Sequence, residues 1–164
     1  MDIKIKKGTM QHRKDCEEAL LNSELGKRYF ASEGSGESAV LEGLEQGNLY
    51  IALIKDRCAG FFYYIPKGCF HSFPYLHLIA VKEEYRGQGI GRKLIDYLEN
   101  VVCADAHRLF LVVADFNPEA KRFYEKNGYR QGGGGSRPFR GGKKPANIHY
   151  DEGKMSEARP DKDS

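Results

Sequence analysis

Three glycines in the stretch Arg86-Gly87-Gln88-Gly89-Ile90-Gly91 follow a segment typical of a strand and lead into a segment typical of a helix. Glycine lets the backbone approach a ligand closely, and the first N–H groups of a helix lie at the positive end of its dipole without intrahelical acceptors. Such a turn predicts an anion site, with phosphate as the obvious ligand. The same glycines would also suit a plain connection from strand to helix, so the turn alone leaves both interpretations open.

Three kinds of phosphate-binding turn use glycines at similar spacing. A nucleoside-triphosphate loop requires Gly-Lys-Ser/Thr, which does not occur at Gly91. A dinucleotide-binding turn, Gly-x-Gly-x-x-Gly, requires a third glycine where this chain has Arg92 or Leu94, and it follows its strand without intervening residues. The third pattern, Arg/Gln-x-x-Gly-x-Gly/Ala, is satisfied by Arg86, Gly89 and Gly91.

The third pattern belongs to the GNAT superfamily of N-acetyltransferases, and the sequence around it resembles that family. Residues 78–92 are similar to the central motif of the family, and the similarity continues through Asn117 and residues 123–129 at the usual separation. The resemblance extends from about residue 48 to residue 130. It implies transfer of an acetyl group from acetyl-CoA, without a metal, directly to a primary amine of a small molecule, a peptide, or a protein N-terminus or lysine. CoA would be the product.

The same resemblance implies which residues contact the cofactor. Main-chain groups of Ile79 and Val81 would pair with the pantetheine arm. Asn117 matches a position that contacts the cofactor, although it is equally suited to cap the helix that follows. Backbone amides of the glycine turn would hold the pyrophosphate, and the turn residues concerned are Arg86, Gly87, Gln88, Gly89, Ile90, Gly91 and Arg92.

Tyr124 resembles the family's tyrosine beside the departing sulfur, where it would contact the cofactor as well as act in catalysis. The ordinary pKa of a phenol, near 10, exceeds that of a thiol, near 8.5, so full proton transfer would run uphill by about 2 kcal/mol. We therefore interpret Tyr124 as a hydrogen-bond donor to the thiolate. Simple packing of its helix on the sheet is the alternative.

The general base is less well defined by the sequence. At two positions where relatives carry a catalytic glutamate, this chain has Tyr75 and Val112. His77 falls where arylalkylamine N-acetyltransferases have one of their strand histidines, and an imidazole can accept a proton near pH 7. A packing role for His77, and a proton relay through water, both remain open.

The elements that must position these residues follow from the hydrophobic pattern. Strands are expected at residues 3–7, 49–54, 58–65, 75–81 and 109–114, with a short one at 147–150, and helices at 11–21, 38–45, 90–102 and 118–126. The third helix has one apolar stripe, formed by Ile90, Leu94, Ile95, Leu98, Val101 and Val102. Strand and helix alternate in the second half, which predicts a parallel pair of strands. The expected fold is α/β (α+β), with a mixed, mostly antiparallel twisted sheet, one parallel βαβ unit and helices on both faces.

Length and composition set the remaining expectations. The 164 residues, 40% hydrophobic and 30% charged, suit one domain at residues 1–150 with a polar, disordered tail at 151–164. With no apolar run near membrane-spanning length and no signal-peptide pattern, we expect a cytoplasmic monomer or homodimer without membrane contact. The four scattered cysteines are interpreted as reduced thiols that fill space. The net charge of +3 mildly favours an anionic ligand.

The glycine-rich, basic segment 131–144 replaces the strand hairpin that usually borders the acceptor site in the family. It fits a solvated loop, an acceptor lid that prefers acids, or an Arg-Gly contact to nucleic acid, which is the least expected of the three. Three functions therefore compete: an amine acetyltransferase, a dinucleotide-dependent enzyme, and a catalytically impaired CoA-binding regulatory module. The missing third glycine argues against the dinucleotide, whereas the missing carboxylates leave the regulatory module open.

Overall fold

The computed structural model describes residues 2–23, 26–27, 30, 32, 34–69, 73–106, 108–114, 118–129, 137–138 and 145–151. The chain divides into two compact units. The first unit comprises Met1–Tyr64 and Leu78–Leu98, and the second comprises Ile65–His77 and Glu99–Ser164. Strands β3 (Arg57–Cys69) and β4 (Phe73–Val81) each contribute residues to both units. Of the tail expected at residues 151–164, Asp151 belongs to a strand, and residues 152–164 lie outside the described residues.

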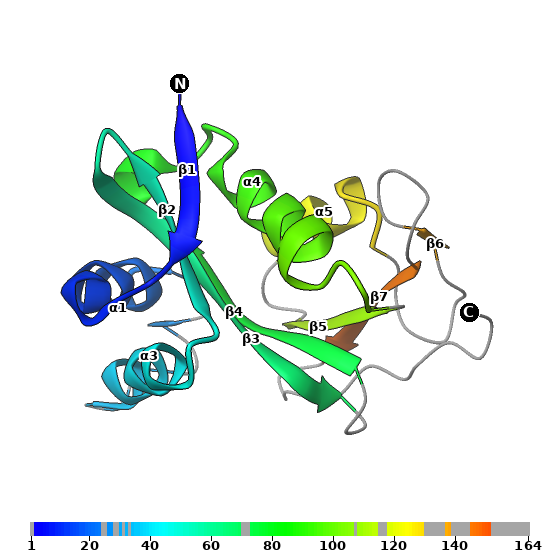
Figure 1. The fold of residues 1–164 in the computed structure, drawn as a ribbon. Coiled ribbons are helices and arrows are strands. Elements are labelled where there is room, and N and C mark those ends of the chain that lie inside the picture. Colours follow the sequence, from blue (N-terminus) through cyan, green and yellow to red (C-terminus); the bar gives the residue numbers. More distant parts are fainter. Residues whose placement is uncertain are drawn as a thin grey trace. The chain divides into compact units, whose positions relative to one another are not determined.

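The sheet of the first unit has the strand order β1-β2-β3-β4 (Figure 1). Strand β1 (Ile3–Lys7) pairs antiparallel with β2 (Leu49–Ile54), and β2 pairs antiparallel with β3. The hairpin turn between β2 and β3 consists of Lys55 and Asp56, both at positive φ (50° and 65°), as a tight two-residue hairpin turn requires. The expected hairpin is confirmed, with β3 longer than the sequence indicated.

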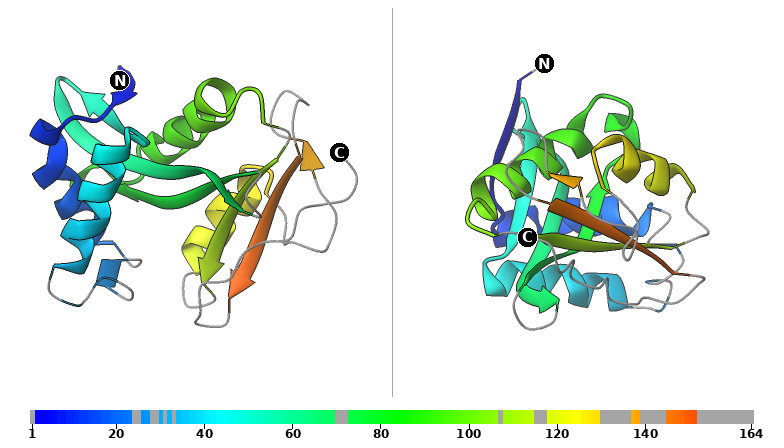
Figure 2. Two further views of the ribbon diagram at one scale, coloured as in Figure 1. Left: turned by 60° about the horizontal axis from the view of Figure 1, so that its bottom comes forward. Right: turned by 90° about the vertical axis from the view of Figure 1, so that its right-hand side faces the viewer.

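Helices cover both faces of this sheet, since α3 and α4 lie on opposite sides of the strands in Figures 1 and 2. The helical segments of the unit are η1 (Met10–His12), α1 (Arg13–Leu21), α3 (Ser35–Gln46), η2 (Glu83–Tyr85) and α4 (Ile90–Tyr97). Helix α3 begins three residues before the expected Ser38, so Ser35 and Gly36 belong to the helix and not to the preceding loop. Buried residues from both layers fill the core, among them Leu20, Val40, Ile51, Phe61 and Leu94.

A π-helical turn, η3 (Leu98–Val102), follows α4 and changes which residues are buried. The expected apolar stripe holds through Leu98 but is wrong at Val101, which is 56% exposed. Glu99 is buried instead, at 2% exposure. A π-helical turn closes with wider hydrogen-bonded rings than an α-helix, so the residues within it no longer follow the α-helical period on which the prediction rested.

The second unit contains the expected parallel pair. Strand β4 pairs parallel with β5 (Leu109–Ala114) through Tyr75–Phe110 and Leu76–Leu111. Strand β7 (Pro145–Asp151), longer than the expected 147–150, runs parallel beside β5 and antiparallel to β6 (Arg137–Pro138), as Figure 2 shows. Helix α5 (Pro118–Lys126) ends at Asn127 and Gly128, as expected. The mixed sheet with helices therefore confirms the predicted fold class.

Two further observations bear on the expectations from composition. Cys16, Cys58 and Cys103 are free thiols and are buried, which agrees with a space-filling role. Within the described residues, no helix has both the length and the apolar character needed to cross a membrane.

Candidate active site

The glycine turn lies in the first unit, between the end of β4 and the start of α4. Gly87 and Gly89 have φ values of 77° and 82°, in the left-handed region that favours glycine. A Cβ atom at either position would meet nothing within 4 Å. These glycines are therefore required by backbone conformation and not by lack of space.

The start of α4 supplies backbone donors. The N–H of Lys93 makes the first helical bond, to the carbonyl oxygen of Gly89 at 3.1 Å. The N–H groups of Ile90, Gly91 and Arg92 precede that bond and so have no acceptor one helical turn back. Together with the helix dipole, they form the kind of site in which a pyrophosphate fits. The assignment of this turn to the cofactor stays a prediction.

The side chain of Arg86 is engaged with the protein backbone. Its Nε donates to the carbonyl oxygen of Val81 at 3.1 Å, and its Nη2 donates to the carbonyl oxygen of Asn22 at 3.1 Å. Asn22 is the C-cap residue of α1. The guanidinium group therefore ties the turn both to the end of β4 and to α1, and a contact between Arg86 and the cofactor would come from its main chain.

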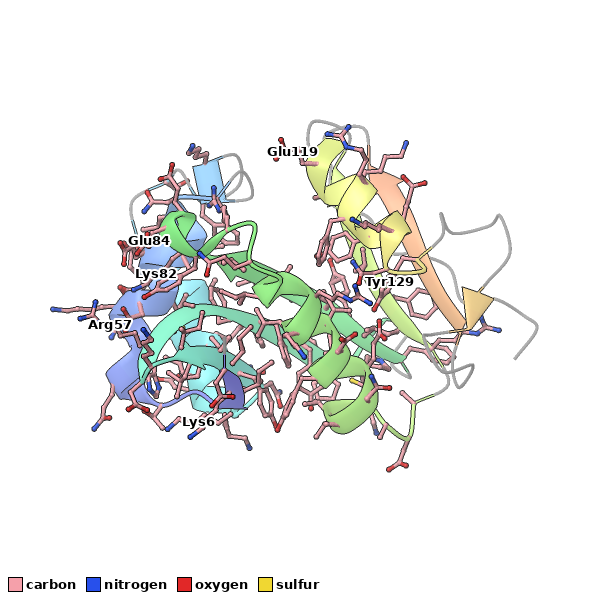
Figure 3. All side chains as sticks on the ribbon, turned by 90° about the horizontal axis from the view of Figure 1, so that it is seen from above. Lys6, Arg57, Lys82, Glu84, Glu119 and Tyr129 are labelled. Atoms are coloured by element: carbon pink, nitrogen blue, oxygen red, sulfur yellow. The ribbon has the colours of Figure 1, made fainter. Side chains whose placement is uncertain are left out.

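A partly buried ion-pair cluster, which the sequence did not reveal, lies beside the turn. The ammonium group of Lys82, whose side chain is 11% exposed, contacts Asp15 Oδ1 and lies 3.1 Å from Glu18 Oε2. Lys82 is labelled in Figure 3. Burial alone would lower the pKa of Lys82, but the hydrogen bonds to Asp15 and Glu18 outweigh it and raise the pKa. The two acids lie three residues apart on α1, and Asp15 is 67 residues from Lys82 in the sequence.

Tyr124 lies in the second unit, on α5, with an exposure of 6%. Its ring centroid is 5.1 Å from that of Phe123 and 5.8 Å from that of Tyr129, in both cases edge to face. Burial, and secondarily Tyr75, raise the pKa of Tyr124 above its ordinary value. The phenol therefore keeps its proton at neutral pH, which suits a hydrogen-bond donor better than a proton acid.

His77 also lies in the second unit, on β4, with its Nδ1 atom buried. Its ring centroid is 6.0 Å from that of Tyr75, the residue whose electrostatic influence reaches Tyr124. Tyr75 thus packs against His77 and helps to raise the pKa of Tyr124, the two residues to which the sequence assigns catalysis.

Some of the other predicted site residues lie on β4, and others lie outside the described residues. Ile79 and Val81 alternate along β4 with the buried Leu78 and Ala80, and their own side chains are half-buried. Asn117 lies outside the described residues, as do residues 131–136 and 139–144 of the basic segment. Across the part of the chain that is described, no group of three His, Cys, Asp or Glu residues could hold a metal ion.

Sequence comparison identifies the family of this chain. A sequence model described as "Acetyltransferase (GNAT) domain" matches residues 45–131, more than half of the chain. The chain belongs to the GNAT acetyltransferase family. Acetyl-CoA is the cofactor typical of this family. No curated protein sequence matches the chain.

Comparison with solved structures agrees with this family assignment at the level of the fold. A GNAT-family acetyltransferase from Bacillus cereus is 15% identical, with a TM-score of 0.62 over 78% of this chain and 82% of that one. A transcriptional regulator from Bacillus halodurans is 21% identical, with a TM-score of 0.64 over 83% and 98%. AAC(6')-Iy, solved with the bisubstrate analogue CoA-S-monomethyl-acetylneamine, is 15% identical, with a TM-score of 0.59 over 77% and 89%. At such identities the likeness shows the fold alone.

Proposed function

We propose that this protein transfers an acetyl group from acetyl-CoA directly to a primary amine of a small molecule, a peptide or a protein. The observation that carries the proposal is the glycine turn, where two left-handed glycines lead into the first N–H groups of α4, which have no acceptor one helical turn back. Membership of the GNAT family supports the same cofactor. AAC(6')-Iy, a protein of similar fold, was solved with a CoA-containing analogue.

The proposed reaction is a direct displacement at the thioester. The neutral amine forms a bond to the carbonyl carbon, and the carbon–sulfur bond then breaks to release the CoA thiolate. Tyr124 donates a hydrogen bond to this thiolate and keeps its own proton, since burial raises the pKa of its phenol. The proton that the amine loses passes to His77 or to water. A His77→Asn variant lowers kcat if His77 is the base and leaves it unchanged if water is.

A catalytically impaired CoA-binding regulatory module is the second candidate. Tyr75 and Val112 occupy the two positions at which relatives carry a catalytic glutamate. One protein of similar fold is described as a transcriptional regulator. In this case the protein would bind acetyl-CoA without turnover.

Two measurements distinguish these functions. Acetyl-CoA is expected to raise the melting temperature of the protein and NAD to leave it unchanged; the reverse result would exclude the proposed cofactor. Release of free thiol from acetyl-CoA is then followed with a panel of amines, peptides and polyamines. Thiol release that depends on the amine supports the enzyme, whereas a shift in melting temperature without release supports the module.

The remaining attributes belong to the same proposal. A single acetyltransferase domain at residues 1–150 would act in the cytoplasm as a monomer or homodimer. Its partner would be an amine-bearing acceptor, which the panel is designed to identify, and neither a membrane nor a nucleic acid is expected.

A further inference from the structure

A buried polar pair lies beside Tyr124 in the second unit. The hydroxyl group of Tyr129 donates a hydrogen bond of 2.7 Å to Glu99 Oε1, and both residues are only 2% exposed (Figure 3 labels Tyr129). A carboxylate so far from water is costly to bury, and a short hydrogen bond to it is stronger than one between neutral groups. Stability alone seldom favours such a pair, because apolar residues of similar volume are often equally stable.

Tyr129 is attached to Tyr124 in two ways. Its N–H donates to the carbonyl oxygen of Tyr124 at 3.0 Å. Its ring meets the Tyr124 ring edge to face, with centroids 5.8 Å apart and planes inclined by 70°. Gly128, at φ 97°, reverses the chain after α5 so that both contacts form. A displacement of the Tyr129 ring would therefore be transmitted to Tyr124.

Glu99, which accepts the hydrogen bond of the pair, lies in the π-helical turn η3. Glu99 occupies the buried side of this turn, whereas Val101 faces solvent. An irregular turn that buries a carboxylate and exposes a valine is costly in stability, and a functional role of the carboxylate would explain why this cost is kept. Among its interactions, Glu99 accepts the hydrogen bond of the Tyr129 hydroxyl, whose ring is in contact with Tyr124.

We propose that Glu99 and Tyr129 are positioning residues for acetyl transfer: Glu99 fixes the Tyr129 hydroxyl, and the fixed Tyr129 ring holds Tyr124 in the orientation needed to donate to the departing sulfur. The inference rests on the proposed function and adds two residues that touch neither cofactor nor acceptor. Burial, and then the charge of Glu99, raise the pKa of Tyr129, so that its O–H donor persists through the neutral range.

The test compares kinetics in two backgrounds. Tyr129→Phe removes one hydroxyl group and keeps the ring. In the wild-type background we expect kcat to fall about tenfold, within the roughly hundredfold loss that a 1 Å misplacement can cause. The KM for acetyl-CoA stays within about twofold, because the glycine turn is unchanged. In a Tyr124→Phe background the same substitution has little further effect, since there is no hydroxyl left to orient.

Two further variants separate positioning from stability. The double variant Glu99→Leu/Tyr129→Phe replaces the polar pair by apolar groups, so that no carboxylate is left buried without its donor. We expect it to melt close to wild type and still to show the reduced kcat. The matched control is Tyr63→Phe, because Tyr63 is 1% exposed and also donates to a glutamate, Glu42 Oε2 at 2.8 Å, in the first unit. We expect this control to keep its kcat.

The outcomes are distinct from those that test the proposed function. If wild-type protein neither binds acetyl-CoA nor releases thiol, the proposed function fails and the positioning role fails with it. If wild type is active but Tyr129→Phe retains full kcat, or lowers it equally in both backgrounds, only the positioning role is overturned. A double variant that recovers wild-type kcat together with stability overturns it as well.

Discussion

Arg86 donates from its Nη2 atom to the carbonyl oxygen of Asn22, across 64 residues of sequence. The bond joins the glycine turn to the C-terminal end of α1, and the Nε of the same guanidinium group bonds the end of β4. The arginine of the family pattern thus serves the shape of the turn in this chain. The donors that a pyrophosphate would need are then the backbone N–H groups whose positions the guanidinium fixes.

Replacing Arg86 by alanine should therefore weaken cofactor binding without changing the chemical step. Loss of two charge-assisted bonds at an exposed site corresponds to about 1 kcal/mol, or about a fivefold rise in the KM for acetyl-CoA, with kcat unchanged. Arg13→Ala is the control, because the 39%-exposed Arg13 pairs with Glu17 at 2.9 Å within α1 and does not contact the turn. Equal KM values in the two variants would show that Arg86 does not support the turn.

Lys82→Met tests the ion-pair cluster beside the turn. The variant should lose about 1 kcal/mol of unfolding free energy, because Asp15 and Glu18 are themselves 40% and 51% exposed and the pairs are partly screened. Chemical denaturation of the two proteins measures the difference. The control is Lys14→Met, because Lys14 is exposed and lies on α1 with Asp15 and Glu18. This variant should lose no measurable unfolding free energy.

The difference in unfolding free energy between wild type and Lys82→Met should depend on pH in a definite direction. Since folding raises the pKa of Lys82, its contribution is fully present below the ordinary lysine value, about 10.4, and is lost as the pH rises through the folded value. The stability gap between wild type and Lys82→Met should be constant from about pH 7 to 9 and should narrow only at more alkaline pH. If the difference in unfolding free energy already decreased below pH 9, Lys82 would not be stabilised in its charged form by its acidic partners.

The two N-cap glycines Gly34 and Gly89 give a matched test of the turn. Both have a φ of 82°, and a Cβ added at either would meet no atom within 4 Å. Alanine at either position should cost about 1 kcal/mol or more of backbone strain. Only Gly89→Ala should also raise the KM for acetyl-CoA, since Gly34 caps α3. An equal KM in both variants would remove Gly89 from the cofactor site.

What the sequence predicted correctly was encoded locally. The conformation of the glycine turn, the strand before it and the end of α5 at Gly128 depend on residues a few positions apart. Lys82 and Asp15 lie 67 positions apart, and the local sequence around each residue does not indicate that the two are in contact. The burial of Glu99 was missed for a different reason, since the α-helical period favoured Val101 and nothing in the local sequence signals a π-helical turn.

Tyr124 provides the sharpest test of the proposed chemistry. Removing its hydroxyl group in Tyr124→Phe takes away a donor to the developing thiolate, so kcat should fall by about a hundredfold, comparable to loss of one oxyanion-hole donor. The KM for acetyl-CoA should change little.

Because burial raises the pKa of Tyr124 above its ordinary value near 10, the phenol keeps its proton throughout the neutral and mildly alkaline range. With an acceptor amine that is neutral above pH 7, wild-type kcat should show no fall between about pH 8 and 10. A fall in that interval that Tyr124→Phe abolishes would instead indicate an ionising phenol and a role as proton acid.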